Sequence, residues 1–395
     1  MRVDWFTALT IGSTLVSCGP APSVRAATTT PLMPLMKEAP PRGPLLATGL
    51  RSSCLLRDPW HAACVGERRA SFSFKTRVES LGLNEYAFNA LFVVGTVDVW
   101  RLDREPYEHS TTLRLNAEQV SNGLLHTCAL GGGIVTCWGY NDVGQLGRET
   151  HEERGEAMPV ALEGNVTALA AGEFHTCALF DDGAVRCWGS NREGQLGIQG
   201  GSVRGAAPGD MGAELPAVVL AEPAIAIAAG RTHSCALLTS KRVQCWGSNL
   251  HGSLGASASI VEVAPTSFVS LGASKVRLLA AGGYRTCAAL EDNTLKCWGR
   301  GDFGALGQGH TRSIGLSAAE MGEALPAVRL GHGSPIVEIS MAQDHTCVLF
   351  EGGHAKCWGR NDSGQLGING GNRGDEQGEM GEHLPFADFA VELPK

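Results

Sequence analysis

An all-β fold, a single β-propeller of about six four-stranded blades, is what three observations on this sequence predict. Twelve of the 13 cysteines form six pairs whose members are nine or ten residues apart. The first members of these pairs recur at intervals of 49 to 74 residues, a repeat length typical of propellers and other repeat arrays. A typical interval holds about four short apolar segments punctuated by some of the chain's 52 glycines, as in a four-stranded blade.

The order of segments within one repeat is clearest between residues 215 and 249. A Pro-led strand at Leu215–Leu220 comes first, and a small-residue strand at Ala224–Gly230 follows it. A hairpin with the arms HSCALL and RVQCWGSN completes the repeat. We count six such units, and residues 66–122 form either a degenerate seventh blade or an insert.

The two ends of the propeller domain complement each other. The chain ends in LPFADFAVELPK, a Pro-led strand without a hairpin after it, whereas Pro44–Leu56 carries the second half of a repeat. We expect the C-terminal strand to pair beside the N-terminal hairpin and close the ring, because closure removes exposed sheet edges.

The cysteine pairs have the spacing of cross-strand disulfides. A three-residue turn at Asp181–Gly183, with Gly183 in the left-handed conformation, places Cys177 opposite Cys187. The pair that is nine apart contains Gly132–Gly133, and a two-residue turn there restores the same alignment. Neither a short zinc-binding knuckle nor a redox C-x-x-C is present, so we expect no metal site. The predicted disulfides are Cys54–Cys64, Cys128–Cys137, Cys177–Cys187, Cys235–Cys245, Cys287–Cys297 and Cys347–Cys357.

The N-terminal region has the features of an export signal. Residues 1–17 contain an apolar stretch at Trp5–Val16 that is too short to span a bilayer. The segment LVSC, which ends at Cys18, resembles the lipobox of bacterial lipoproteins, and the resemblance implies a lipid on Cys18. The alternative is an ordinary signal peptide with a chance cysteine. Residues 18–43 would then hold the lipidated cysteine and a Pro-rich linker, and residues 44–395 the propeller.

A Gly-rich turn follows the hairpin in five repeats, for example WGYNDVGQLG at 138–147 and WGRNDSGQLG at 358–367. Together with approaches such as AAGEFHTCAL, it resembles the regulator-of-chromosome-condensation repeat family over roughly residues 120–395. The resemblance implies a propeller of four-stranded blades. Members of that family act as guanine-nucleotide exchange factors, as chromatin binders and, in bacteria, as enzyme inhibitors. Cysteine pairs are not a hallmark of the family, and they suit an oxidising compartment.

Histidine and tryptophan recur at fixed places in the repeat, and we interpret both as packing groups between blades rather than as ligands or a stacking platform. Ser52 and Arg285 take the place of histidine in two repeats, which argues against a ring of ligands. The sequence contains no G-x-S-x-G, H-E-x-x-H or P-loop motif, so we predict no catalytic residues and no cofactor. The recurring residues are His126, His175, His233 and His345, and Trp138, Trp188, Trp246, Trp298 and Trp358.

Three long Gly-rich loops vary more than the rest of the repeat. They lie at Ile198–Leu215, Gln308–Leu325 and Ile368–Leu384, at one place in the unit, so they should emerge on the same side of the ring. Binding residues concentrate on such loops, although unselective solvent loops are an equal alternative. One of them contains an RGD tripeptide, which arises easily by chance. The candidate partner-binding residues are Arg204, Met211, Arg312, Met321, Arg373, Asp375 and Met380.

These features predict a binding module for an unknown protein or glycan, anchored through the N-terminal lipid to the membrane of a bacterial cell envelope and facing the periplasm or the outside. Without the lipid it would be secreted. The formal net charge of −8 and the absence of a basic stretch disfavour nucleic acid as a partner. We expect a monomer that is not an enzyme. The alternatives are an inhibitor of a secreted enzyme, an enzyme that acts on surface polymers, and a passive scaffold.

Overall fold

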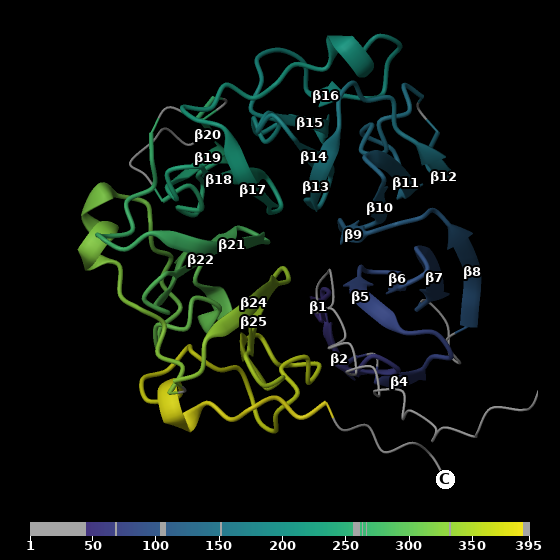
Figure 1. Ribbon diagram of the computed structural model, residues 1–395. Coiled ribbons are helices and arrows are strands. Elements are labelled where there is room, and N and C mark those ends of the chain that lie inside the picture. The colour runs from purple at the N-terminus through teal and green to yellow at the C-terminus, as the bar shows by residue number, and fades with distance from the viewer. Residues whose placement is uncertain are drawn as a thin grey trace, which may run out of the picture. The chain divides into compact units, whose positions relative to one another are not determined.

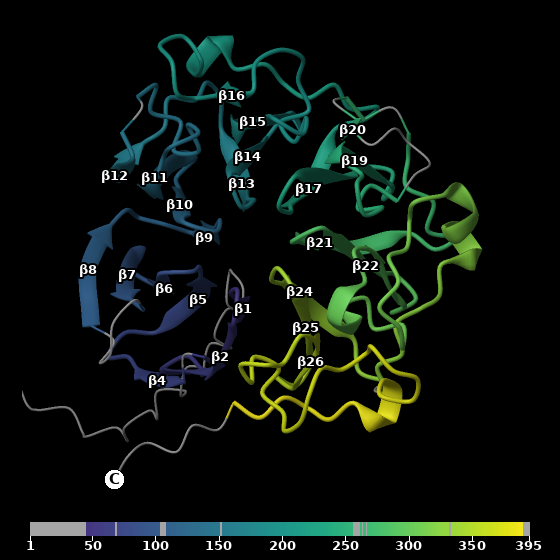
Figure 2. The same ribbon diagram turned by 180° about the vertical axis from the view of Figure 1, so that it is seen from behind.

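Seven antiparallel sheets make up the part of the chain described by the computed structural model, and they surround a common axis (Figures 1 and 2). The described residues are 45–389 except 68, 103–107, 151, 256–260, 263, 266 and 332. The predicted signal peptide, Cys18 and the Pro-rich linker lie outside them. The first strands of neighbouring blades contact each other in the order β1, β5, β9, β13, β17, β21, β24 and back to β1. The chain is therefore an all-β, single propeller.

The strands follow one another outward in each blade. Blades 1 to 3 hold β1 (Leu46–Thr48), β2 (Ser52–Asp58), β3 (His61–Gly66), β4 (Ala70–Ser73), β5 (Val78–Leu83), β6 (Ala87–Phe92), β7 (Thr96–Arg101), β8 (Glu108–Arg114), β9 (Gln119–Asn122), β10 (His126–Gly131), β11 (Ile134–Tyr140) and β12 (Arg154–Pro159). Blades 4 and 5 hold β13 (Val166–Ala171), β14 (His175–Phe180), β15 (Val185–Ser190), β16 (Val203–Arg204), β17 (Ala224–Ala229), β18 (His233–Leu238), β19 (Val243–Ser248) and β20 (Val261–Glu262). Blades 6 and 7 hold β21 (Val276–Gly282), β22 (Arg285–Leu290), β23 (Leu295–Gly299), β24 (Ile336–Met341), β25 (His345–Phe350) and β26 (Ala355–Gly359).

Blades 6 and 7 have three strands each, and their fourth strand is reduced to the single bridges Gly299–Ile314 and Gly359–Arg373. Short 3-10 turns lie in the three long loops: η1 (Gly212–Glu214), η3 (Ala318–Glu320), η4 (Gly322–Ala324) and η5 (Gly381–His383). A further one, η2 (Asp302–Gly304), lies in the Gly-rich turn that follows β23.

Of the two alternatives for residues 66–122, the structure has the seventh blade: residues 78–114 form a complete four-stranded blade, which brings the six counted units to seven. Strands β5 to β8 make a four-stranded sheet between residues 78 and 114. This blade has neither a cysteine pair nor the Gly-rich turn, which is why the repeat pattern misses it. Aromatic packing holds it instead: the ring of Phe88 lies 4.3 Å from that of Phe72 and 5.5 Å from that of Trp100.

The two ends of the ring meet between blades 7 and 1. The backbone N–H of Leu45 donates to the carboxylate of Glu338 at 2.9 Å, and the hydroxyl of Ser53 donates to the carbonyl of Gln365 at 2.8 Å. In the C-terminal segment, the N–H of Ala387 donates to the carbonyl of Ala355, at the outer edge of blade 7. Residues 390–395 lie outside the described part, so ring closure by a C-terminal strand stays a prediction.

The hairpins have the predicted turns and all six disulfides. In every pair the two cysteines are directly opposite in the ladder, with Cα atoms 4.0–4.1 Å apart. Gly183 has a φ of +82°, and Gly132 and Gly133 have φ of +57° and +79°. The two turn types thus keep one alignment of the cysteines, as the spacing predicts.

The recurring histidines are buried packing groups that join neighbouring blades. The Nε2 of His126 lies 2.9 Å from the hydroxyl of Thr176 in the next blade, and that hydroxyl donates to the carbonyl of Gln145 at 3.1 Å. Because the hydroxyl has only one proton, the imidazole donates to it and is neutral, with its proton on Nε2. The same relay recurs at His175–Ser234, His233–Thr286 and His345–Ser53.

Glycine before each of three histidines leaves room for the ring. A Cβ added at Gly172 would lie 2.2 Å from Cε1 of His175, and Gly123 and Gly230 have the same relation to their histidines. The steric fit explains the spacing of glycine and histidine in AAG-x-x-H. Four of the recurring tryptophans are fully buried, and each donates its indole N–H to a carbonyl of the preceding blade, as from Trp188 to Gln145 at 3.0 Å.

Arg285 occupies the histidine position in blade 6 and, like the histidines, joins its blade to the next one. Its guanidinium is buried, donates to the hydroxyl of Thr346 in blade 7 at 3.0 Å and to the carbonyl of Ala342 at 2.7 Å. Burial lowers its pKa to about 10, so it stays charged at neutral pH. The four carbonyl and hydroxyl acceptors around it offset part of the cost of burying the charge.

Candidate functional site

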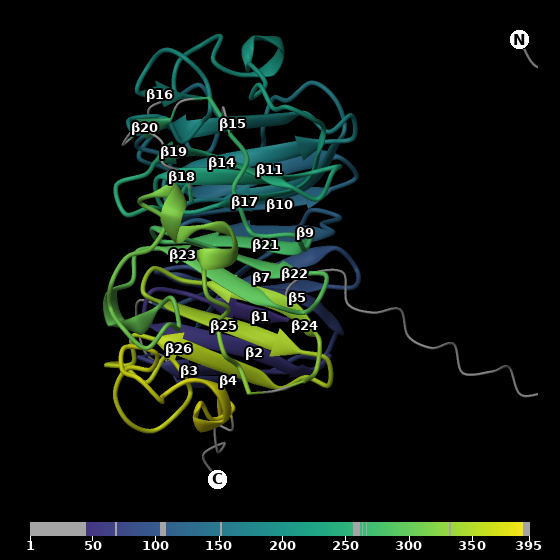
Figure 3. The same cartoon turned by 90° about the vertical axis from the view of Figure 1, so that its left-hand side faces the viewer.

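The ring has two ends with different loops. At one end, here called the loop end, the connections between first and second strands lie beside the turns that follow the third strands. Backbone hydrogen bonds join them, for example from Arg300 to Tyr284 and from Arg360 to Asp344, both at 3.0 Å. The opposite end, here called the hairpin end, holds the turns of the cysteine hairpins. Figure 3 shows the ring from the side, with the short strands β16 and β20 and several of the 3-10 turns at its left.

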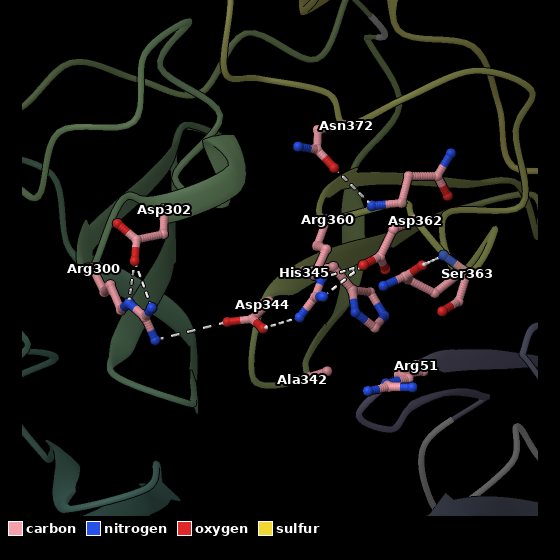
Figure 4. Close-up of polar contacts among 12 residues, drawn as sticks. Arg51, Arg300, Asp302, Ala342, Asp344, His345, Arg360, Asp362, Ser363 and Asn372 are labelled. Atoms are coloured by element: carbon pink, nitrogen blue, oxygen red, sulfur yellow. Dashed lines mark hydrogen bonds and ion pairs between the residues drawn. The ribbon is translucent and has the colours of Figure 1, made fainter.

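Charged and aromatic side chains from four consecutive blades meet at the loop end and form what we call the charged rim. In its blade 6 and 7 half, Nε of Arg300 donates to Asp302 at 2.6 Å, and Nη1 of Arg360 donates to Asp344 at 3.3 Å (Figure 4). Asp344 also lies 3.9 Å from Nη1 of Arg300, so it bridges the two blades. The charged rim consists of Glu173, Arg231, Tyr284, Arg300, Asp302, Asp344, Arg360 and Asp362.

The blade 4 and 5 half joins the first through an aromatic ring. Oε2 of Glu173 lies 3.1 Å from Nη1 of Arg231. The guanidinium of Arg231 lies 5.4 Å from the ring centre of Tyr284, and that of Arg300 lies 5.9 Å from it on the way to blade 7. Such cation–π contacts hold the arginine planes in place while leaving part of each group accessible.

The ionisation of the rim follows from its burial and pairing. Burial raises the pKa of Glu173 to about 7, against the opposing charge of Arg231. The hydrogen bond from Arg360 holds the pKa of Asp362 below its usual value, and the same contact raises the pKa of Arg360. The rim therefore presents fixed opposite charges in blade 7 and a carboxyl that titrates near neutral pH in blade 4.

A cavity of about 140 Å³ opens on the axis at the loop end. Loops from all seven blades line it. Its lining includes the carboxyl groups of Glu85 and Glu173 and the amide of Gln343. Pockets for small organic ligands usually enclose about 300–1,000 Å³. The cavity is smaller than such pockets.

The described part of the chain has neither a cluster of metal-ligating side chains nor a helix that could span a membrane. Among the described residues of the range 45–389, no three His, Cys, Asp or Glu side chains lie close enough together to hold a metal ion. The helices of that part include none with the length and apolar character needed to cross a bilayer.

The three long loops leave their blades at equivalent places, as predicted. Arg204, Ile314 and Arg373 pair with the glycine of the Trp-Gly pair in the third strand of their blades. Each loop wraps around one carboxylate: Asp210 accepts backbone N–H groups of Gly205, Ala206 and Ala207 at 2.8–3.0 Å. Glu320 and Glu379 do the same in the other two loops. These ties give the loops defined shapes despite their glycine content.

The candidate loop residues separate into anchors and surface groups. Met211 and Met321 are buried in two different hydrophobic clusters of the propeller, and Met380 packs, partly buried, against the cluster that contains Met321. The three methionines therefore attach the loops to the propeller. Arg204 pairs with Asp210 at 3.4 Å, and Arg373 pairs with Glu379 at 3.6 Å. Arg312 is exposed, and Asp375 accepts from Asn372 at 3.4 Å. A binding role for these loops stays a prediction.

Sequence reasoning missed the charged rim. Its members occupy four repeat positions. Two are the residues just before the histidine position, and two are the first and third residues after Trp-Gly. At the first residue after Trp-Gly, Arg300 and Arg360 stand in place of Tyr140, Ser190 and Ser248. Comparing these positions across the repeats would have shown arginine and acid concentrated in blades 6 and 7. Only the ring, however, brings residues of different blades together.

The fold and the relay of histidine, hydroxyl and carbonyl define a seven-bladed propeller built from one repeated unit. The chain belongs to the RCC1-like domain family, whose model matches residues 78–390. This agrees with the resemblance drawn from the Gly-rich turns.

Individual relatives are similar along most of the propeller. The ultraviolet-B receptor UVR8 of Arabidopsis thaliana is 29% identical over 322 residues, which cover 69% of this chain and 71% of that protein. The probable E3 ubiquitin-protein ligase HERC4 of Homo sapiens is 32% identical over 67% of this chain, but that match spans only 24% of HERC4. The crystal structure of Prp20p from Saccharomyces cerevisiae has a TM-score of 0.60 at 19% identity and covers 75% of both chains. That last likeness concerns the fold alone.

Proposed function

We propose that this chain is a non-enzymatic binding module for a protein partner, held in a bacterial cell envelope by a lipid on Cys18, with the charged rim as its contact surface. The observation that carries the proposal is the rim itself: arginines, a tyrosine and acids from four blades gathered on one end of a rigid ring. Arginine and tyrosine are enriched at the energetic centres of protein interfaces. A glycan is the other class of ligand that loops of this kind bind.

The relatives support protein binding as the general role. The structure of Prp20p is described with its binding to Gsp1p and histones, and a second structure shows Kap60 bound to yeast RCC1. Another relative is named a secretion-regulating guanine nucleotide exchange factor. For this chain the same mode of action is inferred with a different partner, because six disulfides fit an oxidising compartment.

The anchor rests on the sequence of residues 1–43. The apolar stretch Trp5–Val16 and the segment that ends at Cys18 support export and lipidation, and the Pro-rich residues after them support a spacer. Inhibition of a secreted enzyme is a special case of the same proposal, in which the partner is a hydrolase.

Removal of two rim side chains should strongly weaken partner capture. We expect the double variant R231A/Y284A to lose at least about 2 kcal/mol of binding free energy, or roughly thirtyfold in Kd, because both side chains lie between blades 4 and 6 at the centre of the rim. The measurement is affinity capture from envelope and secreted extract of the source organism, followed by titration of the captured partner.

The matched control is Lys275→Glu, which changes an exposed charge at the hairpin end. Retention of the same partner by R231A/Y284A, with both variants folded by circular dichroism, would exclude the rim as the contact surface. Raising the salt concentration should weaken capture by the wild type, since the contact involves the partly exposed charges of Arg231, Arg300 and Arg360.

An enzyme remains the second candidate because of Glu173. Its pKa of about 7 and its place on the axial cavity suit a general acid or base. Turnover of surface polymers by the wild type that Glu173→Gln abolishes would favour this role.

A further inference from the structure

We propose that the hairpin end of blades 1 to 3 rests on an anionic lipid surface, which orients the propeller on the membrane that carries its anchor. The inference builds on the anchor of the proposed function. Its carriers are four exposed side chains at the tips of three consecutive hairpins, here called the apolar tips: Trp60, Val93, Val94 and Ile134.

The hairpin turns of blades 1 to 3 expose apolar side chains, whereas the corresponding turns of the other blades are polar. Trp60 is 44% exposed, Val93 51%, Val94 61% and Ile134 60%. The equivalent turns of blades 4 to 7 contain Asp181, Asp182, Ser240, Lys241, Glu291, Asp292 and Glu351. Turn tips are ordinarily polar, so an apolar set on three adjacent blades marks a surface that leaves water.

The backbone at these tips is held so that the side chains project outward. The N–H of Trp60 donates to Asp58 at 2.8 Å, and its carbonyl accepts from Phe74 at 2.8 Å. The N–H of Val93 donates to the carbonyl of Arg77 at 3.0 Å. Because these hydrogen bonds already fix the backbone, insertion of the apolar tips into lipid would lose less conformational entropy.

The chain enters the propeller at the same end. The carbonyl of Leu45 accepts from the N–H of Leu56 at 2.8 Å, and Leu56 is four residues from Trp60 along β2 and its turn. Forty-four residues precede Leu45, and they carry the apolar segment and Cys18. A lipid on Cys18 would therefore be joined to the propeller at Leu45, at the end on which the apolar tips lie.

Charge complementarity identifies the lipid as anionic. Arg57, Lys75 and Arg114 are exposed beside the tips of blades 1 and 2. The acids Asp58 and Glu118 are also exposed there, and Asp58 lies 2.9 Å from His61. Blades 4 to 7 carry five acids on their tips against the basic Lys241, Arg242 and Lys275, so that half of the hairpin end has a negative balance and is less suited to an anionic surface. Tryptophan and long basic side chains are the groups that favour the membrane–water interface.

This orientation places the charged rim at the end of the propeller that faces away from the membrane. Because the rim and the apolar tips lie at opposite ends of the ring, lipid contact and partner binding do not compete.

The test is quenching of tryptophan fluorescence by brominated acyl chains. The full chain is reconstituted in vesicles of phosphatidylethanolamine and phosphatidylglycerol, with or without bromine in the chains, and compared with Trp60→Phe. The phenylalanine keeps an apolar side chain but removes the emission of Trp60. We expect a quenched component in the wild type that W60F lacks, and its loss in V93D/V94D.

The matched control is Leu250→Asp, which places a charge at an exposed leucine of the loop end and should leave the quenching unchanged. Equal quenching in wild type and W60F, or full quenching in V93D/V94D, would overturn the inference. The apolar tips would then be a contact surface for a protein ligand instead. Flotation of the wild type and Cys18→Ser tests the anchor separately. If the chain floats with the vesicles but shows no Trp60-dependent quenching, the anchor is present and the lipid contact of the apolar tips is disproved. If added vesicles cause Trp60-dependent quenching but the chain does not float, only the anchor is disproved.

Discussion

Reduction of the six disulfides is expected to unfold most of the propeller. Each bridge closes a loop of about ten residues and contributes about 2–3 kcal/mol in the chain-entropy model. Single domains have net stabilities of only about 5–15 kcal/mol, so the combined loss is comparable with the whole stability. The measurement is urea-induced unfolding of the oxidised chain and of the chain refolded with its thiols reduced.

Blade 2 provides an internal comparison, because its described strands contain no disulfide and pack through Phe88 and Trp100 instead. Hydrogen exchange should show its amides protected longest after reduction. The variant C177A/C187A removes one bridge and should lower the free energy of unfolding by a single increment. Identical urea midpoints for oxidised and reduced chains would show that the hairpins are stable without their bridges.

The propeller should lose stability as the pH falls below 6.5, because the four inter-blade histidines are held neutral. Burial lowers the pKa of His126 and His233 to about 4, and that of His175 and His345 to about 3. Unfolded histidine has a pKa near 6.5, so the unfolded chain binds protons that the folded chain does not. Each histidine therefore lowers the free energy of unfolding by about 1.4 kcal/mol per pH unit between 6.5 and its folded pKa.

Two buried carboxyls act in the opposite direction. Burial raises the pKa of Glu173 and Glu338 to about 7, so the folded chain keeps protons that the unfolded chain releases above pH 4.5. Their stabilising contribution to the free energy of unfolding grows as the pH falls from 7 to 4.5, and it offsets the loss caused by two of the four histidines. The expected net loss is about 2.7 kcal/mol per unit between pH 6.5 and 4.5, and about twice that just below.

Urea unfolding at a series of pH values from 7.5 to 3.5 measures this profile. The variant Glu338→Gln removes one offsetting carboxyl and should steepen the loss between pH 6.5 and 4.5 by about 1.4 kcal/mol per unit. If the histidines were protonated in the folded chain, only the two carboxyls would contribute, and the free energy of unfolding would instead rise as the pH falls through that window.

Sequence reasoning reached furthest where the physics is local. The cysteine spacing and the turn residues determine the cross-strand disulfides, because a hairpin's alignment depends only on the few residues of its turn. Gly183, Gly132 and Gly133 have the positive φ that these turns require. The interpretation of histidine and tryptophan as packing groups was also correct, since each recurs at one fixed place in the unit.

The seventh blade and the charged rim depend on tertiary structure. Strands β5 to β8 carry no repeat motif, and the blade is formed because Phe88 and Trp100 complete an aromatic core with Phe72 from the preceding blade. Glu173 and Arg231 are 58 residues apart in sequence, and Arg300 and Asp344 are 44 apart. Only the angle between successive blades brings each pair to salt-bridge distance, and no local pattern of residues encodes that angle. The sequence alone thus determined the repeated unit and its covalent bridges, whereas packing between units decided how many blades there are and which side chains meet on the loop end.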